Sequence, residues 1–180
     1  MSDTRERILR AVLRVIAEEG VAGVTNRRVA REAAVSLGSI TYHFATQTDL
    51  LRDSLLLFVG EETTRLAALA EAQRGAAVTV EQAAVLVQRV AETLPSEIAP
   101  LELYLHAGRD PALRGAAAAC FAAYDQLAVE VLTALGVPSP DRLAGPVVAL
   151  VAGTQLRALA TGTAPAVADA LLLLVSPAAR

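Results

Sequence analysis

The sequence predicts an all-α protein of about nine helices, with a three-helix N-terminal domain (residues 1–45) and a larger helical C-terminal domain (residues 46–180). Apolar residues recur every three to four positions, and no five-residue stretch alternates cleanly enough to suggest a strand. Ser, Thr, Asp and Pro stand where helices would begin, and Gly stands where several would end. These signals together favour helices throughout.

The first helix is predicted to begin at Asp3 or Thr4 and to end at Gly20, where a left-handed C-cap belongs. Glu6 with Arg10, and Arg14 with Glu18, are pairs four residues apart that support a helix. Its apolar positions form one stripe, made of Ile8, Ala11, Val12, Val15 and Ile16.

Two short helices joined by a tight turn are predicted next. Thr25 can cap the first of them, Ala34-Val35 forms the break, and Ser36 can cap the second, which runs to about His43. Thr46 then opens a further helix, with Asp49 completing a variant of the capping box. The residues predicted to face inward are Val29, Ala30, Ala33, Val35, Ile40 and Phe44.

This layout is typical of a helix-turn-helix, whose second helix enters the major groove of DNA. A small residue lets the backbone approach DNA, while hydroxyl groups suit phosphates and base edges. Phosphate contacts are predicted for Thr25, Arg27, Arg28, Tyr42, His43 and Gln47. Base-edge contacts are predicted for Leu37, Gly38, Ser39 and Thr41, and Ser36 belongs to the same DNA-binding set. The alternative is a solvated arginine face beside an aromatic core and rim.

From Thr46 onward the whole chain is predicted to be helical. Pro95 and Pro100 are assigned to a linker, and Gly145-Pro146 marks either a kink or the true start of a helix. The predicted helices cover residues 47–74, 79–94, a short segment ending near Gly108, a long one from Asp110-Pro111 to before Gly136, one from Ser139-Pro140, and 165–175.

Composition excludes several classes of protein. The chain has 180 residues and a net charge of −3, but residues 1–52 carry eight arginines against six acidic residues. This asymmetry favours one DNA-docking module over general coating of nucleic acid.

The single cysteine, Cys120, excludes an internal disulfide and is interpreted as a packed small hydrophobe. Without a signal-peptide pattern, and with apolar runs too short to cross a bilayer, the protein is expected to be cytoplasmic with no membrane partner.

The first 51 residues resemble the DNA-binding domain of the TetR (tetracycline-repressor) family of bacterial regulators. TRERILRAVLRVIAEEG is similar to the first helix of that family, VTNRRVAREAAVS to the second helix and turn, and LGSITYHFATQTDLL to the recognition helix and the start of the fourth. Three positions depart from the family pattern: Ala34 replaces a common Gly, Leu37 an often basic residue, and Gln47 a common Lys.

The resemblance implies a homodimeric repressor that binds double-stranded DNA at a palindromic operator and leaves it when a small effector binds. Two C-terminal helices are candidates for the dimer interface, although an intrachain core would explain the same patterns. One carries Ala117, Cys120 or Phe121, Tyr124, Leu127 or Ala128, Val131 and Leu135, and the other carries Gly145, Ala149, Gly153 and Ala160.

The effector pocket that the resemblance implies would be mostly aliphatic, because aromatic residues are scarce, so an apolar effector is expected. The polar residues that could orient it are Arg89, Tyr104, His106, Tyr124 and Gln155. No metal or other cofactor is expected, since the histidines and the cysteine lack ligand spacing. No catalytic motif indicates an enzyme. The alternatives are a helical sensor that does not bind DNA and a ligand-independent regulator or activator.

Overall fold

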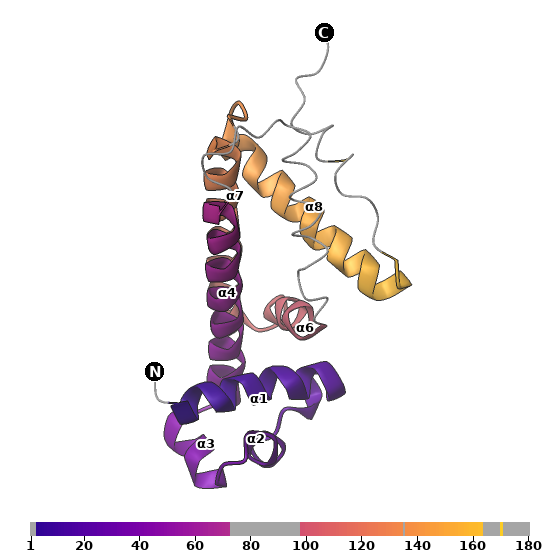
Figure 1. The fold of residues 1–180 in the computed structure, drawn as a ribbon. Helices are drawn as coiled ribbons and strands as arrows, with labels where there is room; N and C mark the ends of the chain where they lie inside the picture. Colours follow the sequence, from indigo (N-terminus) through magenta and orange to yellow (C-terminus); the bar gives the residue numbers. More distant parts are fainter. Residues whose placement is uncertain (1–2, 73–97, 135, 164–169, 171–180) are drawn as a thin grey trace. The chain divides into compact units, whose positions relative to one another are not determined.

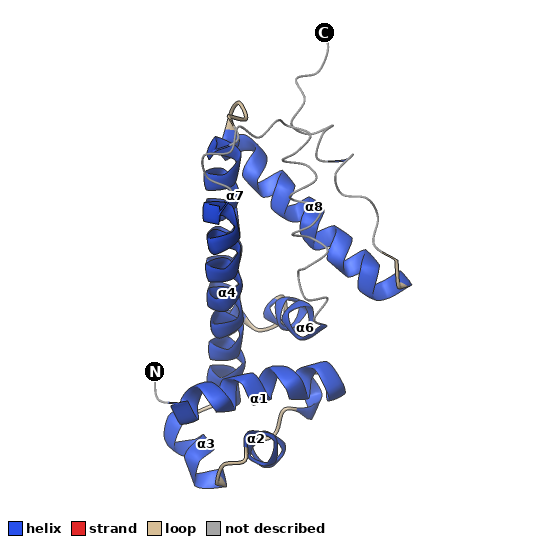
Figure 2. Cartoon of the chain, in the orientation of Figure 1, coloured by secondary structure: helices blue, strands red, loops and turns tan. Residues whose placement is uncertain are grey.

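The computed structural model describes residues 3–72, 98–134, 136–163 and 170 (Figure 1). These residues form seven α-helices and one short 3₁₀ helix, and no strand occurs among them (Figure 2), which confirms the all-α prediction. The helices are α1 (Asp3–Glu19), η1 (Val21–Gly23), α2 (Asn26–Ala33), α3 (Leu37–His43), α4 (Gln47–Ala72), α6 (Ile98–Ala107), α7 (Pro111–Ala134) and α8 (Pro140–Thr161). The helices expected at 79–94 and 165–175 lie outside the described residues, apart from Ala170.

The chain forms two compact units, and each is interrupted in the sequence. Met1–Glu61 and Glu97–Cys120 make the first unit, and Glu62–Ser96 and Phe121–Arg180 make the second. In the first unit α1 contacts α2 on one side and α6 on the other, and α2 contacts α3 (Figure 1). The helix-turn-helix therefore packs in one unit with a helix that follows it by more than fifty residues.

The core of the first unit is built on the apolar stripe predicted for α1. All five residues of that stripe are fully buried. Full burial of an aliphatic side chain of this size stabilises a fold by roughly 1.5–3 kcal/mol. The rest of the unit contributes Val29, Ala33, Ile40, Phe44, Leu50, Leu55 and Leu103 to the buried set. Helix α1 is therefore the support on which the other helices of the unit are positioned.

The segment that follows α1 depends on a glycine. Gly20 has a φ of +74°, and its N–H donates to the Ile16 carbonyl at 2.9 Å. The next amide, that of Val21, donates to Oε2 of Glu102 on α6 at 2.9 Å. A Cβ at Gly20 would lie 3.2 Å from the same carboxylate oxygen. The positive φ and the close approach both favour glycine, and Glu102 accepts from an amide at the start of η1, which the sequence did not predict.

Prolines and caps explain where the later helices begin. Pro100, assigned to a linker, lies instead in the first turn of α6, where amides need no partner within the helix. Asp110 caps α7 as predicted, because its Oδ1 accepts from the Ala112 amide at 2.9 Å. Helix α8 begins at Pro140 and continues through Pro146, but Ser139 is left-handed and its side chain does not cap the helix, contrary to expectation.

Helices α7 and α8 are long and apolar enough to cross a membrane, by length and composition alone. Their most apolar windows have mean hydropathies of 1.2 and 1.4, and 17% of each window is buried. The apolar runs counted in the sequence were too short for a bilayer because a run ends at each polar residue, whereas a mean hydropathy averages over such residues. Cys120 is buried as predicted, and burial raises the pKa of its thiol to about 11, so that it stays protonated at neutral pH.

The turn between α2 and α3 contains a strained alanine. Ala34 has φ 51° and ψ 49°, the left-handed conformation that its replacement of Gly had suggested. We expect Ala34→Gly to raise the free energy of unfolding by about 0.5–1 kcal/mol, because relief of the strain outweighs the entropy of the unfolded glycine. Ala17→Gly, at an exposed site in α1, should lower it by about 1 kcal/mol. Urea denaturation showing the same sign for both variants would contradict this explanation.

Candidate nucleic-acid interface

Helix α3 is fixed by its cap and by one buried residue. The Ser36 hydroxyl accepts from the Ser39 amide at 3.1 Å, as predicted for an N-cap, and it lies 2.9 Å from the Ser39 hydroxyl. Ile40 has no exposed surface, and the Phe44 amide closes the helix by donating to its carbonyl at 2.9 Å. One side of this seven-residue helix is thereby anchored in the core, and the opposite side is left outside.

Of the α3 residues predicted to face DNA, Leu37, Gly38, Thr41 and Tyr42 are exposed, whereas Ser39 and His43 are half-buried. Tyr42 is 84% exposed and Leu37 is 46% exposed. The rings of Tyr42 and His43 meet edge to face, with centroids 5.0 Å apart. The Thr41 hydroxyl donates to the Gly38 carbonyl at 3.2 Å. The result is a mostly uncharged surface on the helix that would enter a groove.

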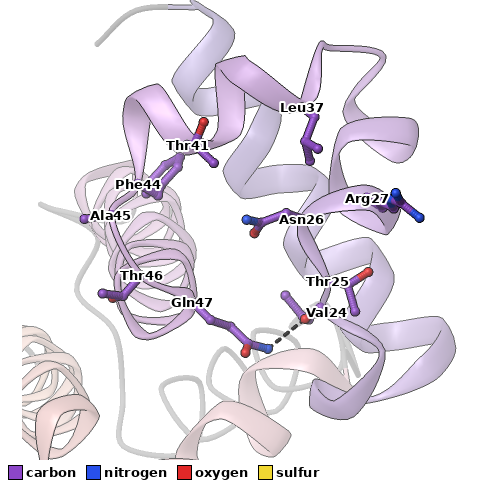
Figure 3. Close-up of a pocket in the computed structure, with 10 residues that line it drawn as sticks. All are labelled: Val24, Thr25, Asn26, Arg27, Leu37, Thr41, Phe44, Ala45, Thr46 and Gln47. Carbon is purple, nitrogen blue, oxygen red and sulfur yellow. Dashed lines mark hydrogen bonds between the residues drawn. The ribbon is translucent and has the colours of Figure 1, made fainter.

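A hollow of about 580 Å³ lies between the start of α2, the outer side of α3 and the start of α4 (Figure 3). We call it the α2–α3–α4 hollow. It is lined by Val24, Thr25, Asn26, Arg27, Leu37, Thr41, Phe44, Ala45, Thr46 and Gln47. No acidic side chain is among these residues. Two helix N-termini, each with partial positive charge, therefore border a concave surface that suits an anionic phosphate.

Capping and side-chain hydrogen bonds hold the edges of the hollow. The Thr25 hydroxyl accepts from the Arg28 amide at 3.2 Å, which confirms the predicted cap of α2. Gln47 Nε2 donates to the Val24 carbonyl at 2.7 Å and so links the start of α4 to the segment before α2 (Figure 3). Thr46 and Asp49 each accept from the amide of the other at 3.1 Å, which confirms the capping box. The hydrogen bond from the Thr46 hydroxyl lowers the pKa of Asp49.

The two neighbouring arginines of α2 have different surroundings. Arg27 is exposed, lines the hollow and pairs with no carboxylate in the described part of the chain. The Arg28 side chain is only 12% exposed and pairs with Glu18 and Glu19 at 2.6 Å and with Glu32 at 2.8 Å. Hydrogen bonds to Glu32 and Glu19 raise the pKa of Arg28. Three carboxylates therefore occupy the donors that were predicted to meet phosphate.

Further ion pairs fix the support of the interface. Glu32 also accepts from Arg14 at 2.8 Å, so that Arg14 pairs with α2 rather than with Glu18 as expected. The hydrogen bonds from Arg28 and Arg14 lower the pKa of Glu32. Arg10 pairs with Glu61 at 2.7 Å and thereby joins α1 to α4. These contacts hold α1, α2 and α4 in a defined arrangement behind α3.

The residues predicted to orient an effector belong to both units. Tyr104 and His106 lie on α6 in the first unit, whereas Tyr124 on α7 and Gln155 on α8 belong to the second, and all four are half-buried. Arg89 lies outside the described residues. The hollow is lined by none of them, so their role in effector binding stays a prediction.

Asn26 is a hollow-lining residue that the sequence analysis missed. It is exposed and occupies the first position of α2, beside the cap. The signal that could have found it was its position: a polar side chain directly after an N-cap lies at the positive end of a helix. Its amide can both donate and accept hydrogen bonds at the edge of the hollow.

Comparisons with known proteins match both parts of the chain. Residues 8–53 match the model "Bacterial regulatory proteins, tetR family", and residues 74–177 match "Tetracyclin repressor-like, C-terminal domain". The transcriptional regulator PksA of Bacillus subtilis, described as HTH-type, is 39% identical over 62 residues, which are 34% of this chain. The match spans 30% of the length of PksA.

Solved structures extend the similarity over the whole chain. The multidrug binding protein EbrR, in complex with imidazole, is 33% identical with a TM-score of 0.74, over 100% of this chain and 94% of EbrR. A TetR-family member from Streptomyces coelicolor A3 is also 33% identical with a TM-score of 0.74, over 97% and 99% of the two chains. With its helix-turn-helix and its C-terminal part both matched, the chain belongs to the TetR family of bacterial regulatory proteins.

Proposed function

We propose that the protein is a homodimeric transcriptional repressor that binds a palindromic DNA operator through α3 and leaves it when a small-molecule effector binds. One observation carries the proposal: the exposed side of α3 borders a hollow into which two helix N-termini and Arg27 bring positive charge. This arrangement suits a helix placed in a major groove with the DNA backbone beside it.

The contacts divide by their chemistry. Thr25, Arg27 and Gln47 border the hollow and would hold phosphates, and Gln47 keeps one amide hydrogen for this after donating to Val24. Tyr42 and His43, at the end of α3, would hold the backbone as well. Leu37, Gly38, Ser39 and Thr41 would meet base edges, with Ser36 capping their helix. Arg28 would instead stabilise the contact between α1 and α2.

Exposed small residues on α8 support the dimer. Gly145, Ala149 and Gly153 are all exposed, and a Cβ at either glycine would meet no atom within 4 Å in the described residues. Leu156 on the same helix is 54% exposed. Small residues let two helix axes approach closely. Two recognition helices related by a two-fold axis would read a palindrome, which gives far more specificity than one.

Structures of EbrR in complex with ethidium, proflavin and malachite green support a small-molecule effector. An effector that prefers a state with differently spaced recognition helices would lower operator affinity by its differential binding energy, typically about 1–3 kcal/mol. The effector is expected to be apolar, because the scarcity of aromatic residues would leave the pocket mostly aliphatic. A protein that binds an operator in bacterial DNA would be located in the cytoplasm, where that DNA lies.

Selection of bound sequences from random duplex DNA at physiological salt tests the proposal. The expected result is a palindrome whose half-sites lie about 10 base pairs apart, bound by a dimer in sedimentation. Failure of a folded dimer to enrich any sequence would contradict the proposal and favour a sensor without DNA binding, consistent with the uncharged Leu37 and Gln47. A monomer that binds single half-sites would contradict the dimeric part alone.

A further inference from the structure

We propose that the first turn of α3 recognises thymine through its C5-methyl group, and that Leu37 is the residue that determines this specificity. The proposal rests on the DNA binding proposed above and names the base that the site reads. It follows from three features of α3: the side chains it lacks, the hydrogen bonds within it and the exposure of Leu37.

Helix α3 (LGSITYH) contains none of the side chains that read the other bases in pairs of hydrogen bonds. Guanine is read by Arg or Lys, adenine by Asn or Gln, and cytosine by Glu or Asp. None of these six residue types occurs between Leu37 and His43. The first turn of α3 is therefore unsuited to the strong polar contacts of the major groove.

The hydroxyl groups of Ser36, Ser39 and Thr41 each make a hydrogen bond within the segment, which leaves fewer of their hydrogens for DNA. The hydroxyls of Ser36 and Ser39 lie 2.9 Å apart and hydrogen-bond to each other, and the Thr41 hydroxyl donates to the Gly38 carbonyl at 3.2 Å. The Thr41 hydroxyl has thereby used its single hydrogen and can only accept from outside, whereas its methyl group stays free for an apolar contact. The surface offered to DNA by this turn is mainly apolar.

Leu37 supplies the large apolar side chain of this surface. It is 46% exposed, and its neighbour Gly38 has no side chain to hold the helix away from a base pair. Thr41 is four residues further on, so it shares one side of the helix with Leu37, and both line the α2–α3–α4 hollow (Figure 3). In the major groove the thymine methyl is the apolar group that such a surface can recognise.

Uracil-for-thymine substitution in the selected operator tests the proposal, because uracil lacks only the methyl group. Removing one methyl group from this apolar surface is expected to weaken binding about fourfold, which is about 0.8 kcal/mol, and about fifteenfold when both half-sites are changed. The effect should be confined to one or two thymines in each half-site. The same substitution between or outside the half-sites should leave affinity unchanged.

Protein variants connect the effect to the leucine. Leu37→Ala should bind thymine and uracil operators almost equally. The control, Leu56→Ala, lies on α4 at a position that is 42% exposed and should keep the full ratio of the two affinities. The inference would be overturned if uracil were tolerated at every half-site position, or if Leu37→Ala kept the same ratio of affinities for the thymine and uracil operators. In either case the enriched operator would still support DNA binding. Failure to enrich any operator would overturn both proposals.

Discussion

Replacing Arg27 with alanine is expected to weaken binding to operator and to random duplex by the same factor, about tenfold, and to leave the free energy of unfolding unchanged. Arg27 is exposed beside the hollow, and a hydrogen bond to a charged group contributes roughly 1.5 kcal/mol or more. Phosphate contacts carry no sequence information. Anisotropy titrations at several salt concentrations should also show the slope of log K against log salt becoming shallower by about 0.9 for each phosphate that the arginine neutralises.

Arg28→Ala is the matched control, and for this variant the free energy of unfolding is expected to change and the phosphate contact is not. It leaves Glu18, Glu19 and Glu32 without the guanidinium that joins them, so the free energy of unfolding should fall. Because Arg28 lowers the pKa of Glu32, this stabilisation is present above the ordinary carboxyl pKa of 4.5 and is lost as the pH falls below it. Equal losses of DNA affinity at unchanged stability for both variants would show that Arg28 contacts phosphate after all.

Ile40→Ala is expected to lower the free energy of unfolding of the first unit by about 2–5 kcal/mol, the usual cost of truncating a buried aliphatic side chain. Ile40 is fully buried and joins α3 to the core. A helix of seven residues is too short to persist without such packing. Operator binding should be lost together with stability, as measured by urea denaturation and by titration of the same preparation.

Leu105→Ala serves as the control for Ile40→Ala. Leu105 lies on α6 in the same unit and is 68% exposed, so the same kind of truncation there should change the free energy of unfolding by less than about 0.5 kcal/mol. A small effect of Ile40→Ala, similar to that of Leu105→Ala, would mean that α3 is held by something other than its buried isoleucine.

Features governed by neighbours in sequence could be predicted. The caps at Thr25 and Ser36, the capping box at Thr46 and the left-handed residue at Ala34 each depend on a few adjacent residues. The buried stripe of α1 follows from helical periodicity alone. For the same reason the outer residues of α3 could be named, because the burial of Ile40 fixes the orientation of the whole helix.

Features that depend on distant residues could not be predicted. Arg28 is predicted to contact phosphate, and nothing local shows that Glu18 and Glu19, ten and nine residues earlier, reach its guanidinium. The partner of the Val21 amide, Glu102, is 81 residues away. The hollow likewise needs the starts of α2 and α4 to be brought to the outer side of α3. Five of its lining residues are among the DNA contacts predicted from the helix-turn-helix pattern: Thr25, Arg27, Leu37, Thr41 and Gln47.

The hydrogen bond from the Val21 amide to Glu102 bears on which part of this protein could be exchanged with that of another regulator. A chimera cut after the helix-turn-helix, at residue 45 or 53, would remove the acceptor of the Val21 amide and uncover the side of α1 that contacts α6. The compact unit that contains the helix-turn-helix is discontinuous: residues 1–61 together with 97–120. Recombination at a single point therefore separates segments that fold together. A new pairing of operator and effector would require residues 1–61 and 97–120 to be inherited jointly.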